Sequence, residues 1–90
     1  MRVLVCGDRN WNLWFPVFES VSQLPPDTII IEGEATGADT IGRKAAEHCG
    51  FPVMAFPANW SKYGRAAGPI RNKQMLEEGK PDLVLAFHSN

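Results

Sequence analysis

Cysteine and histidine are scarce in this 90-residue sequence, with two of each. Cys6 and Cys49 have neither the spacing of a disulfide framework nor histidines close by, so we expect two small buried side chains in a reducing compartment. His48 and His88 are isolated, and a metal site needs more ligands than this pattern supplies. The sequence therefore predicts no metal and no cofactor.

Long apolar runs and an excess of one charge are also missing. No apolar run approaches the roughly 20 residues of a membrane-spanning helix, and the first ten residues, MRVLVCGDRN, are too short for a signal peptide. Nine basic and ten acidic residues give a net charge of −1, which argues against a broad basic surface for nucleic acid or an anionic membrane. We expect one domain over residues 1–90, located in the cytoplasm and without a membrane partner.

What the sequence does contain is a regular succession of short apolar segments. Continuous apolar runs, typical of strands buried on both faces, lie at residues 2–6, 28–32, 52–56 and 82–87. Helical patterns lie between them, at residues 14–24, at 38–49 and from GPIRN (68–72) to EGKP (78–81). Strands that alternate with helices pair in parallel through right-handed crossovers. The prediction is a small three-layer α/β domain, Rossmann-like, with a four-stranded parallel sheet in the order 3-2-1-4.

The unusual residues follow the strands, where open parallel sheets bind their ligands. In the segment GEATGAD (33–39), Gly33 lets the chain turn off the strand, and Gly37 leaves room for an anion at the start of the next helix. A second interpretation is that Thr36 and Asp39 form only a variant of the capping box. The segment is not GxGxxG and no Walker lysine follows it, so a dinucleotide fingerprint and an ATPase are both unsupported.

Two arginines at the same edge are candidate anion ligands. Arg9 follows Gly7 and can offer a planar fork to a phosphate, although a pair with Asp8 explains it equally. Arg71 is expected in the first turn of the third helix, where a cation opposes the helix dipole unless an anion shares the site. We therefore expect Arg71 to contact a ligand.

Other side chains at this edge allow two interpretations. Trp60 and Tyr63, expected in the loop before the third helix, either stack on a ring or cover the edge of the sheet. Glu32 and Glu34 flank Gly33 and are expected to be solvated carboxylates. For Trp11 and Trp14, packing in a core or an interface is sufficient.

Taken together, these segments resemble a known family. The stretches RVLVCGDR, EGEATGADTIGRKAAEHCGFPVMAFPANWSKYGRAAGPIRNKQML and KPDLVLAF are similar to the YspA-like (YpsA-related) branch of the SLOG superfamily, over essentially the whole chain. That superfamily includes the LOG phosphoribohydrolases and the Rossmann-like domain of the DNA-processing protein DprA. The resemblance implies a domain that binds nucleotides or nucleotide-derived ligands, and some members have been proposed as sensors.

The resemblance also assigns residues. The Gly-x-Arg turn falls on Gly7 and Arg9, and the glycine-rich element on Gly33, Gly37, Ala38 and Asp39. The Gly-Pro-x-Arg-Asn element falls on Gly68, Pro69, Arg71 and Asn72. The resulting candidate ligand-binding residues are Gly7, Arg9, Gly33, Gly37, Asp39, Gly68, Arg71 and Asn72.

The chain departs from the family pattern at three places. Glu34 stands where the family usually has a second glycine, and Thr36 where it often has an arginine. The negative charge of Glu34 argues against a highly anionic ligand. The family also continues after the last strand into a glycine-rich turn and a helix, which this sequence lacks. In the LOG enzymes that segment supplies a catalytic glutamate, so the resemblance does not extend to the hydrolase activity.

The leading hypothesis is a binding module, with a role as a sensor, for a nucleotide or a nucleotide-derived small molecule at the carboxyl edge of the sheet. A hydrolase that cleaves an N-glycosidic or phosphoester bond is the alternative, with Asp39 or Glu34 as the acid or base. Binding of single-stranded nucleic acid, as in DprA, is not expected at a net charge of −1. Because the third helix covers only part of one sheet face, an apolar patch should stay exposed, and we expect a homo-oligomer.

Overall fold

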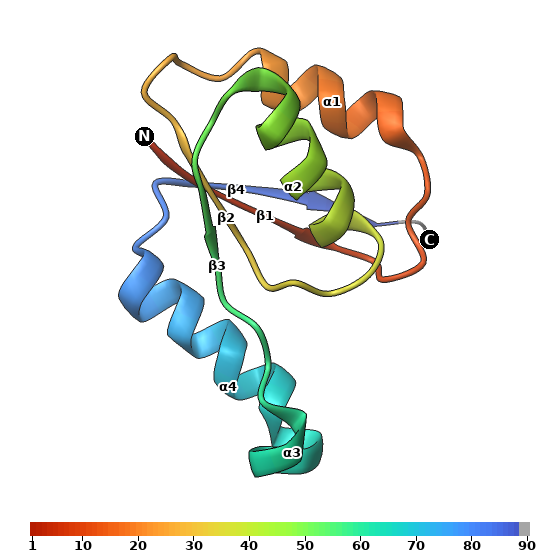
Figure 1. Cartoon of the computed structure of the whole chain (residues 1–90), viewed down its shortest axis with the longest axis vertical. Helices are drawn as coiled ribbons and strands as arrows, with labels where there is room; N and C mark the ends of the chain where they lie inside the picture. The colour runs from red at the N-terminus through yellow and green to blue at the C-terminus, as the bar shows by residue number, and fades with distance from the viewer. Residues whose placement is uncertain (89–90) are drawn as a thin grey trace.

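Four parallel strands form the centre of the molecule, in the order β3-β2-β1-β4 (Figure 1). The computed structural model describes residues 1–88. The strands are β1 (Arg2–Gly7), β2 (Ile29–Glu32), β3 (Val53–Ala55) and β4 (Leu83–Phe87). Each strand matches one of the apolar runs to within a residue at either end. The predicted Rossmann-like α/β class and the 3-2-1-4 strand order are confirmed.

The helices between the strands include one that was not predicted. They are α1 (Trp14–Ser22), α2 (Ala38–Cys49), α3 (Trp60–Tyr63) and α4 (Ala67–Gln74), with a 3₁₀ turn at Gly64–Ala66 and a π turn at Met75–Gly79. The short helix α3 occupies a segment that we expected to be a loop. Asn59 explains its start, because the Asn59 side chain accepts a hydrogen bond from the Lys62 N–H at 3.1 Å.

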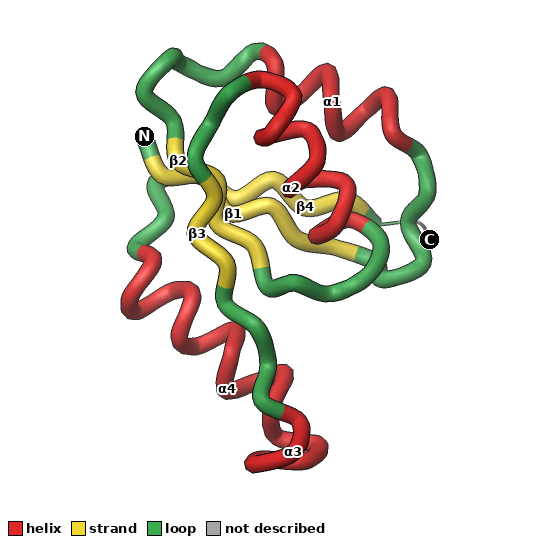
Figure 2. Tube along the Cα trace, in the orientation of Figure 1, coloured by secondary structure: helices red, strands yellow, loops and turns green. Residues whose placement is uncertain are grey.

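The helices α1 and α2 cover one face of the sheet (Figure 2). The strand residues Val3, Val5 and Ile30 point to this face because side chains alternate along a strand. They pack against Val17, Val21, Ile41, Ala45 and Ala46 of α1 and α2. Burial of each of these valine and isoleucine side chains contributes roughly 1.5–3 kcal/mol. This layer is the larger of the two hydrophobic clusters.

The opposite face of the sheet is covered less completely. Leu4 and Ile31 pack there against Met75, the first residue after α4, with Met54 and Phe56 beside them. This cluster lies toward β2 and β3. On the outer strand β4, Val84 is 48% exposed. The expected uncovered apolar residues are therefore present, while the homo-oligomer inferred from them stays a prediction.

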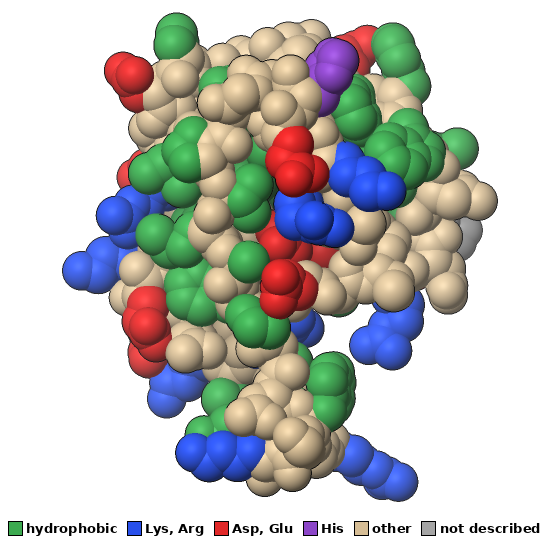
Figure 3. All heavy atoms as spheres, in the orientation of Figure 1, with side chains coloured by type: hydrophobic (Ala, Val, Ile, Leu, Met, Phe, Trp, Pro, Cys, Tyr) green, Lys and Arg blue, Asp and Glu red, His purple; other side chains and the backbone are tan. Residues whose placement is uncertain are grey.

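The segment 60–66, called the arm below, extends from the body of the molecule (Figure 1). Every residue of the arm is exposed. The surrounding residues 48–76 contain four cations and no Asp or Glu, namely Lys62, Arg65, Arg71 and Lys73. Accordingly, the tip of the molecule over α3 carries basic side chains and no acidic ones in Figure 3. The arm is thus a locally basic part of a chain whose net charge is −1.

None of the helices within residues 1–88 has the length and apolar character needed to cross a membrane. This agrees with the absence of a long apolar run in the sequence. The cytoplasmic location remains a prediction.

Candidate functional site

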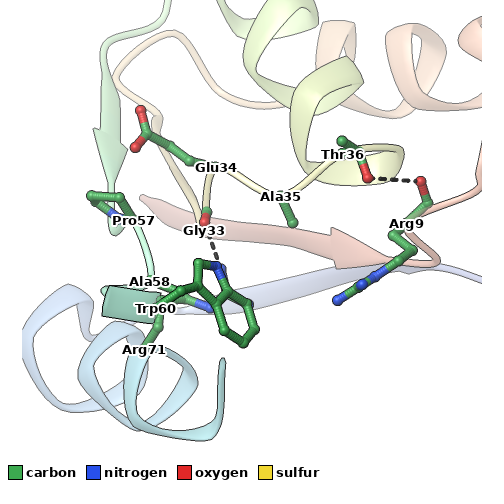
Figure 4. Close-up of a pocket in the computed structure, with 9 residues that line it drawn as sticks. All are labelled: Arg9, Gly33, Glu34, Ala35, Thr36, Pro57, Ala58, Trp60 and Arg71. Carbon is green, nitrogen blue, oxygen red and sulfur yellow. Dashed lines mark hydrogen bonds between the residues drawn. The ribbon is translucent and has the colours of Figure 1, made fainter. Parts of the chain in front are cut away.

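A pocket of about 410 Å³ opens at the carboxyl edge of the sheet. It is lined by Arg9, Gly33, Glu34, Ala35, Thr36, Pro57, Ala58, Trp60 and Arg71 (Figure 4). These residues come from the loop after β1, the turn after β2, the connection from β3 to α3, the start of α3, and α4. The topology thus brings together segments that are far apart in the sequence, at the edge where the strand ends predicted a site.

Gly33 is held from both sides of its backbone. Its N–H donates to the Asp39 carboxylate at 3.0 Å, and its carbonyl accepts a hydrogen bond from Arg71 Nη1 at 2.5 Å. A Cβ atom at Gly33 would lie 2.5 Å from the same Arg71 nitrogen. A side chain at this position would displace the guanidinium of Arg71, which lies against the turn.

The position of Arg71 corrects the argument made for it from the helix dipole. Helix α4 begins at Ala67, so Arg71 is the fifth residue of the helix and lies beyond its first turn. The dipole acts mainly on the terminal turn, and it does not explain this arginine. Arg71 is instead positioned by the Gly33 carbonyl and by Asn72, whose side-chain oxygen accepts a hydrogen bond from Arg71 Nε at 2.9 Å. Asn72 lies outside the pocket and orients its neighbour.

Arg9 reaches the pocket from the opposite side. The carbonyl of Arg9 accepts a hydrogen bond from the Thr36 hydroxyl at 3.2 Å, which ties the loop after β1 to the turn after β2. The Arg9 side chain is exposed, and it extends toward the space beside the Trp60 indole in Figure 4. The Glu34 carboxylate points away from the indole in the same view. Of the two arginines that line the pocket, Arg9 is therefore the more accessible to a ligand from solvent.

Gly37 serves a different purpose from the one we expected. It has a φ of +75°, and a Cβ atom there would overlap the backbone of Asp8 and Arg9. The Asp8 carbonyl also accepts a hydrogen bond from the Ala38 N–H at 3.2 Å. The space beside Gly37 at the start of α2 is thus filled by the loop after β1, and Gly37 does not line the pocket.

The capping-box interpretation of Thr36 and Asp39 is wrong. The N-cap residue of α2 is Gly37, which has no side chain to cap the helix. The Thr36 hydroxyl donates to the Arg9 carbonyl, and Asp39 accepts from Gly33. Both side chains stabilise the turn 33–36 through these hydrogen bonds, and neither caps the N-terminus of α2.

Asp39 is a buried carboxyl at the centre of this network, with 5% of its surface exposed. Burial raises the pKa of Asp39, and the N–H groups of Gly33 and Ala35 together with Arg71 oppose that rise. Asp39 lines a hollow of about 270 Å³ that adjoins the pocket. The hollow shares Arg9, Ala35 and Arg71 with the pocket and is otherwise lined by Cys6, Gly7, Asp39, Asn72, Met75 and His88.

Within this hollow, Cys6 and Gly7 have structural explanations. Burial, followed by the nearby charge of Asp39, raises the pKa of the Cys6 thiol, which disfavours the thiolate needed of a nucleophile. Gly7 has a φ of +145°, and a Cβ atom there would overlap the backbone of Phe87 in the neighbouring strand. Within residues 1–88, no three His, Cys, Asp or Glu residues are grouped so as to hold a metal ion.

Glu32 is the residue that sequence reasoning misjudged most. We expected a solvated carboxylate, whereas Glu32 is fully buried and its Oε1 atom has no hydrogen-bond partner. Burial raises the pKa of Glu32 from 4.5 to about 7. The signal for this was present, because Glu32 follows the buried Ile30 by two residues and so points to the same covered face of β2.

Trp60 contributes the flat apolar surface of the pocket. Its indole is 53% exposed, and it lies close to Gly68, where an added Cβ atom would make only an ordinary contact with the ring at 3.5 Å. Tyr63 lines a separate pocket of about 380 Å³ on the other side of Arg71. Of the two aromatic residues considered for stacking, only Trp60 faces the pocket that contains Arg9.

The chain matches known proteins along most of its length. Residues 1–63 match the model of the YspA, cpYpsA-related SLOG family. The matched range includes the stretch from Gly7 to Asp39 and ends before Arg71. The Gene 61 protein of Mycobacterium phage D29 is 33% identical over 95 residues, covering 96% of this chain and 75% of the phage protein. No solved structure matches the chain significantly. By the extent of both matches, the chain belongs to the YspA, cpYpsA-related SLOG family.

Proposed function

We propose that the protein binds a nucleotide or a nucleotide-derived small molecule in the pocket at the carboxyl edge of its sheet. The observation that carries the proposal is the pocket itself, which is lined by the guanidinium groups of Arg9 and Arg71 and the indole of Trp60. A guanidinium suits a phosphate through its planar fork of donors, and an indole provides a stacking surface for a base. Membership of a SLOG family agrees with a nucleotide-related role.

The other candidate residues act on the shape of this site. Asp39 and Asn72 hold Gly33 and Arg71 in place through hydrogen bonds. Gly7 and Gly37 allow the close approach of Phe87 and Arg9, respectively, whereas a Cβ atom at Gly68 would make only ordinary contact with Trp60. In this proposal Arg9, Arg71 and Trp60 contact the ligand directly, and the remaining residues keep these three side chains in position.

Native mass spectrometry of gently purified protein tests the proposal. We expect a nucleotide-sized mass above the denatured mass, and its loss in Arg9→Ala, which removes an exposed ligand contact. Arg65→Ala is the matched control, because Arg65 is an exposed cation of the arm that does not line the pocket.

Calorimetric titration with AMP, ATP and ribose 5-phosphate then separates the contributions of base and phosphate. Equal ligand affinity in Arg9→Ala and Arg65→Ala would contradict the proposal. So would the absence of binding to all three compounds at millimolar concentration, if no ligand co-purifies with the protein. A steep dependence of affinity on salt would instead favour nucleic acid.

A hydrolase is the second candidate, and the buried carboxyl of Asp39 favours it. Asp39 lines the hollow beside the pocket, and its raised pKa helps it hold a proton for a leaving group. Asp39→Asn retains an oxygen that accepts the Gly33 N–H and should keep the fold. The hydrolase would be supported if the wild-type protein turned over a bound nucleotide and Asp39→Asn still bound that nucleotide without turning it over.

A further inference from the structure

One residue that lines the pocket, Glu34, has a backbone conformation that is unfavourable for any residue other than glycine. Glu34 has a φ of +56°, in the left-handed region, where a side chain is normally avoided. Glycine occupies such positions without penalty. Within residues 1–88, Lys80 is the other non-glycine residue with a positive φ, and it lies outside the pocket. Some contact must therefore keep Glu34 in this conformation.

Glu32 provides that contact. Its Oε2 atom accepts a hydrogen bond from the Glu34 N–H at 2.5 Å. The Glu32 side chain is completely buried. The bond closes a small ring between the end of β2 and the turn 33–36. The other carboxylate oxygen, Oε1, is buried without a partner. A buried acceptor that holds one backbone donor and leaves its second oxygen unpaired is costly to the fold, which indicates a specific role.

The surroundings of Glu32 make its ionisation sensitive to pH near neutrality. Burial raises its pKa to about 7, with smaller contributions in the same direction from Asp39 and Glu34 and an opposing one from Arg43. Among the flanking strands, β3 carries no titratable residue, and β1 carries Arg2 and Cys6. The Glu34 N–H favours the ionised form of Glu32. A proton on Glu32 therefore weakens the bond that holds the turn.

We propose that Glu32 is a positioning residue of the pocket, whose ionised carboxylate holds Glu34 in the left-handed conformation and so fixes the turn 33–36 in its ligand-binding shape. Protonation of Glu32 loosens the turn and weakens binding. The effect on ligand affinity rests on the proposed function. The effect on the turn does not, and it is measurable in the protein without ligand.

The ligand-free test is an NMR titration of the backbone amides between pH 5 and 9. We expect the Glu34 amide proton to shift with a midpoint near 7, and the shift to disappear in Glu32→Gln, which cannot titrate. A Glu34 amide that does not titrate in the wild-type protein, or one that titrates equally in Glu32→Gln, overturns the proposal. AMP is not needed for this result, so it stands apart from the outcome for the proposed function.

The ligand test is a double-variant cycle with AMP as the probe. Glu32→Ala removes the acceptor and should weaken AMP binding about tenfold. Glu34→Gly removes the penalty of the left-handed conformation, so the double variant should bind within about threefold of Glu34→Gly alone. Glu32→Gln, which keeps an oxygen acceptor, should lose less affinity than Glu32→Ala. Glu19→Ala on the exposed side of α1 is the matched control.

Each competing explanation predicts a different result from this cycle. If Glu32 acts only by repelling an anionic ligand, Glu32→Ala should bind AMP more tightly. If Glu32→Ala simply damages the fold, Glu34→Gly should not restore binding. Either result overturns the proposal, and circular dichroism of every variant shows whether the fold is retained.

Discussion

The pocket has two unlike walls. The turn 33–36 is held by Asp39, Arg71 and Glu32 through hydrogen bonds to its backbone, and its Thr36 hydroxyl bonds the loop after β1. The arm 60–66 carries Trp60 on the opposite side, and all of its residues are exposed. One wall is therefore fixed by buried polar contacts, and the other is held mainly by the caps and turns of its own short helix.

This difference separates stability from binding. Changes in the turn should alter both the free energy of unfolding and the affinity, because the same hydrogen bonds support the fold and shape the site. Changes in the arm should alter affinity with little effect on unfolding, since exposed segments contribute few buried contacts.

The largest expected effect compares two glycines with similar backbone conformations. Gly37, beside the turn, has a φ of +75° and no room for a Cβ atom, whereas Gly64, in the arm, has a φ of +56° and nothing within 4 Å. Gly37→Ala should lower the free energy of unfolding by about 3–5 kcal/mol, and Gly64→Ala by about 1 kcal/mol. Urea unfolding followed by circular dichroism measures both. Equal losses would mean that the loop after β1 adapts to the added carbon.

The pH dependence of stability is the next largest effect. Glu32 titrates at about 7 in the fold against 4.5 normally, so its contribution to stability is complete below pH 4.5 and is lost as the pH rises through 7. The fall amounts to roughly 3 kcal/mol. Glu32→Gln should remove most of it, and Asp39, whose pKa is also raised, should account for part of the remainder.

Unfolding by urea at intervals between pH 4 and 8 checks this prediction. Glu19→Gln, at an exposed position on α1, serves as the control and should retain the slope of the wild-type protein. A stability that rises over this range in the wild-type protein would contradict the raised pKa of Glu32.

The two arginines test the comparison within the pocket. Arg71→Ala should weaken ligand binding by roughly 1.5–3 kcal/mol and also lower stability by about 1 kcal/mol, because the Gly33 carbonyl loses its donor. Arg9→Ala should weaken binding by a similar amount and leave stability within about 0.5 kcal/mol, as is usual for exposed side chains. Calorimetry and urea unfolding of both variants separate the two roles. Destabilisation by Arg9→Ala equal to that of Arg71→Ala would remove the distinction.

The smallest effect is expected in the arm. Trp60→Ala should weaken binding of a ligand with a base by about 1–2 kcal/mol through lost stacking. It should leave binding of ribose 5-phosphate and the free energy of unfolding almost unchanged, because the indole is 53% exposed. Trp14→Ala is the control, since Trp14 is also exposed and lies on α1, away from the pocket. Equal losses for AMP and ribose 5-phosphate would show that Trp60 does not stack on a base.

The sequence by itself determined the order of the elements and the edge at which they place the site. Continuous apolar runs and helical periodicity are local signals, and the handedness of parallel crossovers converts their alternation into a sheet order. It also selected Arg9 and Arg71, the two arginines that line the pocket, as candidate ligand-binding residues. The unpredicted helix α3 depended on a single cap at Asn59, too short a signal to separate from a loop.

Only the tertiary structure decided what each residue at that edge does. Gly37 meets the backbone of Arg9, Arg71 bonds the carbonyl of Gly33, and Glu32 lies buried beside α2. Arg71 and Gly33 are 38 positions apart, so no local pattern contains their contact. Whether a glycine makes room for a ligand or for another segment, and whether a carboxylate meets water or a protein interior, depends on which distant part of the chain fills the adjacent space.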